Sequence, residues 1–114
     1  ATVRPAVLRV LGTGHIWLAE PSGLRRFDSQ TLKFAPTIAW PREAGAPASI
    51  SATDARGNTA WITAGAPVVR LDDGTNPKAT AIFSATNPIG ALAAGDDGKL
   101  YFTQGVDLWS APQK

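Results

Sequence analysis

An internal repeat is the feature that most constrains how this chain can fold. Three segments share one pattern: a turn led by Gly, an alternating strand with an aromatic residue, a short break and a second alternating strand. They are Gly14–Asp28 (GHIWLAEPSGLRRFD), Gly57–Asp72 (GNTAWITAGAPVVRLD) and Gly98–Ser110 (GKLYFTQGVDLWS). Trp17, Trp61 and Tyr101 recur about every 40 to 44 residues. This period is typical of four-stranded propeller blades, whereas helical solenoids need 3.6-period stretches that this sequence lacks.

The repeat predicts an all-β fold of about three four-stranded antiparallel β-propeller blades in a single domain. The blades cover approximately residues 6–47, 48–88 and 89–114. The expected strands are Ala6–Leu11, His15–Glu20, Gly23–Asp28 and Leu32–Trp40, then Ala48–Thr53, Thr59–Ala64, Pro67–Asp72 and Lys78–Ala85, and finally Ile89–Ala94, Lys99–Gln104 and Val106–Ala111. Apolar residues occur on both sides of the alternating strands, as expected of a sheet held between two others.

Three blades make only part of a ring, because propellers usually close with four to eight. The third unit lacks an outer strand, and residues 1–5 have no place in the first unit. We therefore expect Thr2–Arg4 to supply a closing strand that ends at Pro5, since an unpaired sheet edge invites aggregation. The partner is either a second copy of the chain or further propeller blades on additional sequence. A start at Ala1 without Met is consistent with a processed or excised product.

Composition excludes several classes of protein. The chain has no Cys, which excludes a disulfide scaffold and a Cys-ligated metal site. The net charge is +2 and the basic residues are dispersed, so we expect no nucleic-acid partner. The sequence has no run of about 18 apolar residues, so we expect no membrane span. We expect the domain to be extracytoplasmic, secreted or periplasmic, as the sensor or scaffold part of a larger protein.

The units resemble the blades of streptogramin-lyase-like, NHL-like and two-component-regulator propellers. The resemblance rests on Gly14-His15-Ile16-Trp17-Leu18-Ala19-Glu20 with Gly23-Leu24-Arg25-Arg26-Phe27-Asp28, and on Asp97-Gly98-Lys99-Leu100-Tyr101-Phe102-Thr103-Gln104. The lyase branch would imply an enzyme that opens a cyclic depsipeptide with a divalent metal, using converging His and Glu side chains. The only His is His15, at a strand start, where a surface or turn role is expected. No catalytic residue or metal ligand is therefore assigned, and no cofactor is expected.

The candidate ligand-binding residues lie in the loops at one end of the blades, where propellers usually bind near their axis. Loops between second and third strands share this end with the loops that join blades. The polar side chains expected to gather there, with one aromatic platform, are Glu20, Trp40, Arg42, Glu43 and Gln104. The alternative for Arg42 and Glu43 is a solvated ion pair, which is usually worth under about 1 kcal/mol.

Other polar and aromatic residues favour structural roles. Arg26 and Arg70 occupy equivalent positions two residues before an Asp, so we expect hydrogen bonds between strands or blades. In the third unit Leu108 is taken as the equivalent residue. Asp96-Asp97-Gly98 lacks the spaced ligands of a calcium loop and is typical of a turn. The three repeated aromatics are expected to pack between blades, with sugar stacking as the alternative.

We therefore expect a non-catalytic module that binds a small molecule, a glycan or a protein. One alternative is a streptogramin-lyase-like enzyme that needs additional blades for its His and metal ligands. The other is a propeller lectin that binds carbohydrate between blades.

Overall fold

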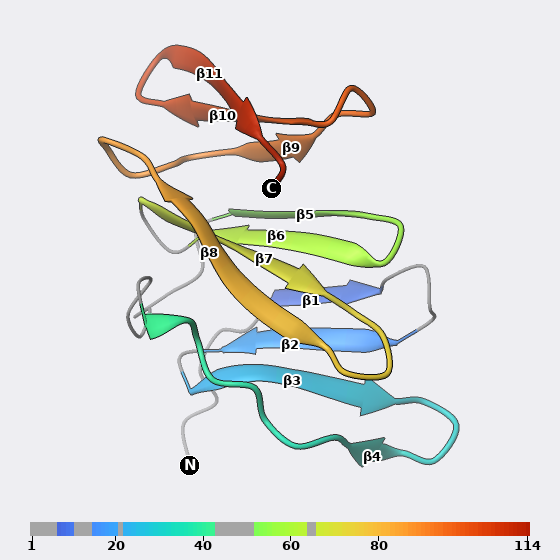
Figure 1. Cartoon of the computed structure of the whole chain (residues 1–114). Helices are drawn as coiled ribbons and strands as arrows, with labels where there is room; N and C mark the ends of the chain where they lie inside the picture. The colour runs from blue at the N-terminus through green and yellow to red at the C-terminus, as the bar shows by residue number, and fades with distance from the viewer. Residues whose placement is uncertain (1–6, 11–14, 21, 43–51, 64–65) are drawn as a thin grey trace.

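Three antiparallel sheets make up the described part of the chain (Figure 1). The computed structural model describes residues 7–10, 15–20, 22–42, 52–63 and 66–114. The strands of each sheet follow one another along the chain and each pairs with its sequence neighbour. The prediction of an all-β fold built from antiparallel sheets is confirmed.

Sheet 1 has the order β1-β2-β3-β4. Its strands are Val7–Val10, Ile16–Glu20, Gly23–Asp28 and Lys33–Phe34. The outer strand is shorter than the predicted Leu32–Trp40. Pro36 cannot donate a backbone hydrogen bond, and pairing resumes only where Ile38 exchanges two hydrogen bonds with Leu24. Gly23 permits this approach, since a Cβ there would lie 2.7 Å from the Ile38 carbonyl oxygen.

Sheet 2 has the order β5-β6-β7-β8. Its strands are Ala52–Arg56, Thr59–Thr63, Pro67–Asp72 and Lys78–Ser84. The predicted inner strand Ala48–Thr53 is wrong at its C-terminal end. The strand continues beyond Thr53 to Arg56, which pairs with Thr59 across the two-residue turn of Gly57 and Asn58.

Sheet 3 has three described strands in the order β11-β10-β9. They are Asp107–Pro112, Lys99–Gln104 and Leu92–Ala94. Among the described strands β11 therefore lies at an edge of the sheet, at the position where β4 and β8 pair with the third strand in the other two sheets. The predicted closing strand Thr2–Arg4 lies outside the described residues.

Sheet 2 lies between the other two sheets and has apolar side chains on both faces. We define the forward face of each sheet as the one that carries Trp17, Trp61 or Tyr101, and the backward face as the opposite one. The first core cluster joins the forward face of sheet 1 to the backward face of sheet 2; it contains Trp17, Ala19, Leu24, Ala60, Ile62 and Leu71. The second joins sheet 2 to sheet 3 in the same sense; it contains Trp61, Val68, Ile89, Leu100 and Phe102. The sheets thus stack in one direction, forward face on backward face.

Candidate functional site

A Trp–Arg pair connects sheet 2 to sheet 3. Trp61 and Arg70 are directly opposite each other on β6 and β7, with the Arg70 guanidinium carbon 6.0 Å from the Trp61 ring centroid. Trp61 Nε1 donates to the carbonyl oxygen of Gln113 at 3.1 Å, and Arg70 Nη1 donates to the same oxygen at 3.2 Å. The two side chains therefore bind Gln113, the residue that follows β11. In sheet 3, β11 corresponds to the third strand of the other two sheets.

The same pair occurs in sheet 1 but reaches a different acceptor. Trp17 and Arg26 are opposite each other on β2 and β3, at 5.8 Å from guanidinium carbon to ring centroid. Arg26 Nη1 donates to Asp73 Oδ1 at 3.1 Å and to the Gly74 carbonyl oxygen at 2.7 Å. Asp73 follows β7, so it occupies the position that Gln113 occupies in sheet 3. The expectation that both arginines make hydrogen bonds between strands or blades is confirmed, since both donate to the next sheet.

Sheet 3 carries no such pair. Tyr101 is opposite Ser110, so Ser110 is the equivalent of the two arginines, and the assignment of Leu108 to that position is wrong. The repeat pattern aligned Ser110 with Asp28 and Asp72, whereas Pro112 stands at the position where those two aspartates end their strands. The Tyr101 hydroxyl instead donates to Asp97 in the preceding turn.

A cluster of three ionisable side chains forms where sheet 1 meets sheet 2. Asp73 has a fully buried side chain, and its second carboxylate oxygen is 2.9 Å from His15 Nδ1. Arg26 binds the first oxygen, so the carboxylate is held between a guanidinium and an imidazole. A buried carboxylate needs such partners, because an uncompensated charge in this environment would be costly. His15 is partly exposed, and its role as a plain surface or turn residue is not what the structure shows.

A cleft of about 220 Å³ opens beside this cluster, on the forward face of sheet 1. The residues that line it include basic, acidic and hydroxyl groups: His15, Arg26, Asp28, Thr31, Lys33, Phe34 and Ala35. The residue before β2, the end of β3, the β3–β4 turn, β4 and the residue after β4 supply them. The Phe34 ring itself packs against Phe27 and Arg25 on the backward face. This end of the sheet is opposite the end at which Glu20 closes β2.

Asp28 organises the turn that borders the cleft. Its Oδ1 accepts hydrogen bonds from the backbone N–H groups of Gln30 at 2.8 Å and Thr31 at 3.3 Å. These backbone bonds, that of Gln30 foremost, hold the pKa of Asp28 below its ordinary value. Leu32 in the same turn has φ 60° and an exposed side chain, a left-handed conformation that is unusual for Leu. The Asp28 carboxylate therefore stabilises the turn and also lines the cleft.

The sequence-predicted site residues are distributed over two sheets. Trp40 Nε1 donates to the Glu20 carbonyl oxygen at 2.8 Å, so these two lie together, and Glu20 also binds Arg25 at 3.2 Å. Gln104 lies at the end of β10, where it accepts a hydrogen bond from the backbone N–H of Asn87. Arg42 is exposed, and Glu43 lies outside the described residues.

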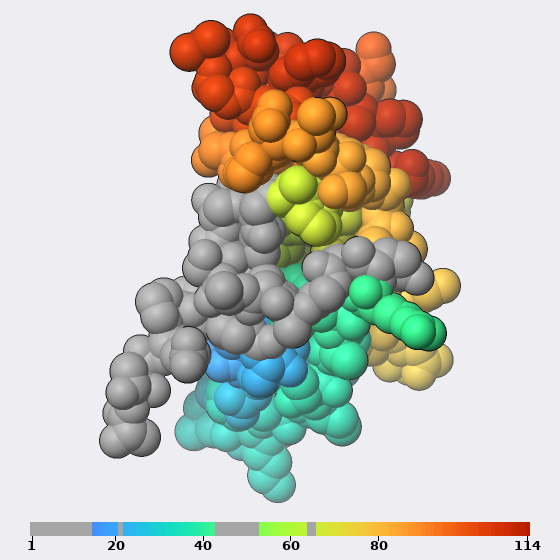
Figure 2. Space-filling model, turned by 90° about the vertical axis from the view of Figure 1, so that its left-hand side faces the viewer, coloured from blue at the N-terminus to red at the C-terminus, as the bar shows by residue number. Residues whose placement is uncertain are grey.

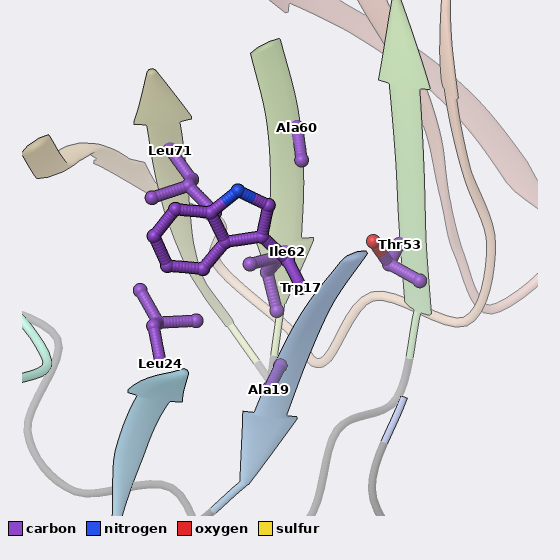
Figure 3. A pocket seen from close by; sticks show the side chains of 7 residues that line it. All are labelled: Trp17, Ala19, Leu24, Thr53, Ala60, Ile62 and Leu71. Atoms are coloured by element: carbon purple, nitrogen blue, oxygen red, sulfur yellow. The ribbon is translucent and has the colours of Figure 1, made fainter. Parts of the chain in front are cut away.

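A second, apolar cavity lies between sheets 1 and 2. Figure 3 shows the Trp17 ring between the side chains of Leu24 and Leu71, with Ile62 beside it. The cavity measures about 10 Å³, room for about one water molecule. Trp17 Nε1 is buried there and makes no hydrogen bond to the described residues. This space is a packing feature of the core.

Two departures from the repeat in the sequence coincide with the cleft. His15 stands where the second unit has Thr59, and Asp73 stands where the first unit has Ser29. Departures from a repeat at facing positions mark places where the architecture no longer dictates the residue. Lys33 and Phe34 could not be found in this way, since they belong to the short, irregular outer strand.

Comparison with protein-family models finds no match, and comparison with curated proteins finds no similar sequence. Within the described ranges, no three His, Asp or Glu side chains gather into a group that could hold a metal ion. No helix among those residues is long and apolar enough to cross a membrane.

Proposed function

We propose that the chain is a non-catalytic binding module built from β-propeller blades, and that it binds a small organic anion in the cleft beside His15. The radial arrangement is supported by the stacking of forward faces on backward faces and by the first strands, since β5 neighbours both β1 and β9. The cleft is the observation that carries the binding role.

The charges around the cleft favour an anion of the carboxylate class. The Asp73 carboxylate is buried between Arg26 and His15. The Asp28 carboxylate accepts hydrogen bonds from backbone N–H groups of its turn. The Lys33 ammonium makes no ion pair with the described residues. Lys33 is therefore the cation that faces a ligand, with Thr31 as a hydroxyl partner, and His15 lines the cleft while bound to Asp73. A volume of about 220 Å³ suits a molecule the size of a dicarboxylate or an amino acid.

A repeated lectin-like site is less well supported. Such a site would recur at equivalent positions, but His15 is replaced by Thr59 and Phe34 by Ala79 in sheet 2. Thr59 Oγ1 donates a hydrogen bond to Asp72 Oδ1 at 3.1 Å, so these two groups bind each other. The first junction therefore offers chemistry that the second does not.

A lyase-like activity is a second candidate because of the bond between His15 and Asp73. A carboxylate that orients an imidazole is a common arrangement in general-base catalysis. Such an enzyme would draw its metal ligands from additional blades. Breakdown of a cyclic depsipeptide that stops on addition of a chelator would favour this candidate over the binding module.

Ligand-observed NMR with succinate, glutamate, inorganic phosphate and N-acetylglucosamine tests the binding role. We expect the carboxylates to bind with a dissociation constant of about 1 mM, since small ligands make few contacts. Lys33→Met should weaken succinate binding by about fivefold, the effect of losing a partly solvated charge partner. Lys78→Met is the matched control, because Lys78 is opposite Asp72 as Lys33 is opposite Asp28.

Equal effects of the two substitutions would contradict a site at the cleft. Binding of N-acetylglucosamine alone would favour the lectin alternative. An extracytoplasmic location remains part of the proposal and is consistent with a module that senses small ligands.

A further inference from the structure

We propose, on the basis of the binding role assigned to the cleft above, that Arg26 selects its ligand. Arg26 binds the α-carboxylate of an acidic amino acid through the edge formed by its Nε and Nη2 groups. The contact with sheet 2 leaves these donors of Arg26 unused, and the charges beside them match such a ligand.

The guanidinium of Arg26 has donors to spare. Both of its hydrogen bonds come from Nη1, which donates to Asp73 Oδ1 at 3.1 Å and to the Gly74 carbonyl oxygen at 2.7 Å. Neither Nε nor Nη2 donates to any residue that the structure describes. These two groups lie side by side in the guanidinium plane and match the two oxygens of a carboxylate. Arg26 lines the cleft and its side chain is 20% exposed, so a ligand there can reach the guanidinium.

The equivalent arginine in sheet 2 has its Nε group engaged. Arg70 Nε donates to Asp72 Oδ1 at 3.0 Å, and Arg70 Nη1 donates to the Gln113 carbonyl oxygen at 3.2 Å. Asp28 is the equivalent of Asp72, since each ends the third strand of its sheet. The Asp28 Oδ1 atom, however, accepts hydrogen bonds from backbone N–H groups of its own turn. The carboxylate that binds the Nε group in sheet 2 is therefore used by the turn in sheet 1.

Three charged side chains share this part of the forward face of sheet 1. The Ala35 N–H donates to the Arg26 carbonyl oxygen, so these two residues are opposite each other. Lys33 is opposite Asp28 and therefore lies diagonally across from Arg26. Such neighbours are about 7–8 Å apart, within reach of long side chains. This patch lies at the end of the described structure away from sheet 3, where the turn after β7 reaches sheet 1 (Figure 2).

The charges of the patch favour an acidic amino acid over a simple dicarboxylate. Arg26 and Lys33 supply two cations, and Asp28 supplies a carboxylate. The Asp73 carboxylate is buried and bound to protein groups, so it does not face the ligand. A ligand with two carboxylates and one ammonium offers an opposite charge to each group that does. We therefore expect the α-carboxylate on Arg26, the side-chain carboxylate on Lys33 and the ammonium on Asp28.

¹⁵N NMR of the arginine Nε–H groups during a titration with glutamate tests the Arg26 contact in the unmodified chain. An N–H without an acceptor exchanges quickly with water, so the Arg26 Nε–H signal should be weak in the free protein. It should gain intensity and move downfield as glutamate binds. The Arg70 Nε–H group is the internal control, because it is already bound to Asp72 and should shift little.

Two failures of this titration have different meanings. Backbone shifts at Thr31 and Phe34 without a change at Arg26 Nε–H would overturn the Arg26 contact and leave the proposed binding role standing. The absence of shifts at all three residues would contradict both proposals.

A matched pair of ligands tests the contact between the ammonium and Asp28. Glutarate has the two carboxylates of glutamate without its ammonium. We expect glutamate to bind about fivefold more tightly, the effect of one partly solvated ion pair. Asp28→Asn should abolish this ratio, because Asn keeps an oxygen for the N–H groups of the turn but carries no charge. Asp72→Asn, at the equivalent position of sheet 2, is the matched control and should preserve the ratio.

Melting curves of both variants show whether each is folded. Equal binding of glutamate and glutarate by the unmodified chain would overturn the assignment to acidic amino acids. An unchanged ratio in a folded Asp28→Asn variant would overturn it as well.

Discussion

The two junctions between sheets share a Trp–Arg pair, but the arginine donates to a different kind of acceptor at each junction. At the junction of sheets 2 and 3, Trp61 and Arg70 bind a backbone carbonyl, which any residue could provide. At the junction of sheets 1 and 2, Arg26 binds the side chain of Asp73, which also binds His15. The first arrangement needs only the right backbone position. The second depends on particular side chains, and the cleft lies beside it.

This difference shows where a repeat protein can place function. Aromatic and apolar residues on the forward faces keep the sheets stacked at both junctions, so the acceptor can change without loss of the stack. A carboxylate at that position then attracts a His from the neighbouring sheet. The chemistry is local, and the architecture around it is shared.

The largest effect should come from removing the aromatic of the second junction. Trp61 is 2% exposed, and Trp61→Ala should lower the free energy of unfolding by about 3–5 kcal/mol through lost burial and packing. Chemical denaturation measures this change. A loss of binding without a loss of stability would instead indicate that the repeated aromatics are ligand platforms.

Asp73→Asn should have the next largest effect and separates the two junctions. It leaves Arg26 without its anionic partner, and we expect a loss of about 2–4 kcal/mol in the free energy of unfolding. Asp72→Asn is the matched control, since Asp72 has a 44% exposed side chain, and it should cost less than about 1 kcal/mol. Equal costs would mean that the Asp73 cluster contributes no more than a surface pair.

A pair of Trp→Phe substitutions sharpens the comparison on a smaller scale. Trp61→Phe removes the hydrogen bond to the Gln113 carbonyl oxygen. This loss should lower the free energy of unfolding by about 1 kcal/mol, in addition to the effect of the smaller side chain. Trp17→Phe removes a buried N–H that has no partner among the described residues. It should therefore cost less than Trp61→Phe in paired urea denaturation curves. The reverse order would contradict the assigned contacts.

The smallest effect concerns the turn of sheet 3, where Tyr101 replaces the tryptophan. The hydrogen bond from the Tyr101 hydroxyl lowers the pKa of Asp97, and the same bond raises the pKa of Tyr101. The contribution of Asp97 is present above the unfolded-state pKa of about 4 and lost as pH falls. That of Tyr101 is present below about pH 10 and lost as pH rises. Melting curves of Tyr101→Phe should therefore approach those of the unmodified chain at both extremes of pH.

Much of the fold could be predicted because period, alternation and turns agree. Alternation in Ile16 to Glu20 and in Lys99 to Gln104 placed two strands within one residue of their observed ends. The outer strand of sheet 1 could not be placed in this way, because Pro36 and the approach of Ile38 to Gly23 depend on tertiary contacts. The cleft escaped prediction for the same reason: His15 and Asp73 are 58 residues apart and meet only when the sheets stack.

Protein-observed ¹H–¹⁵N NMR during a titration with succinate tests the central claim most directly. Binding at the cleft predicts shifts that cluster on His15, Thr31 and Phe34, with little change at the equivalent Thr59 and Ala79 of the second junction. Shifts centred on Glu20, Trp40 and Gln104, at the opposite end of the strands, or equal shifts at both junctions, would contradict it.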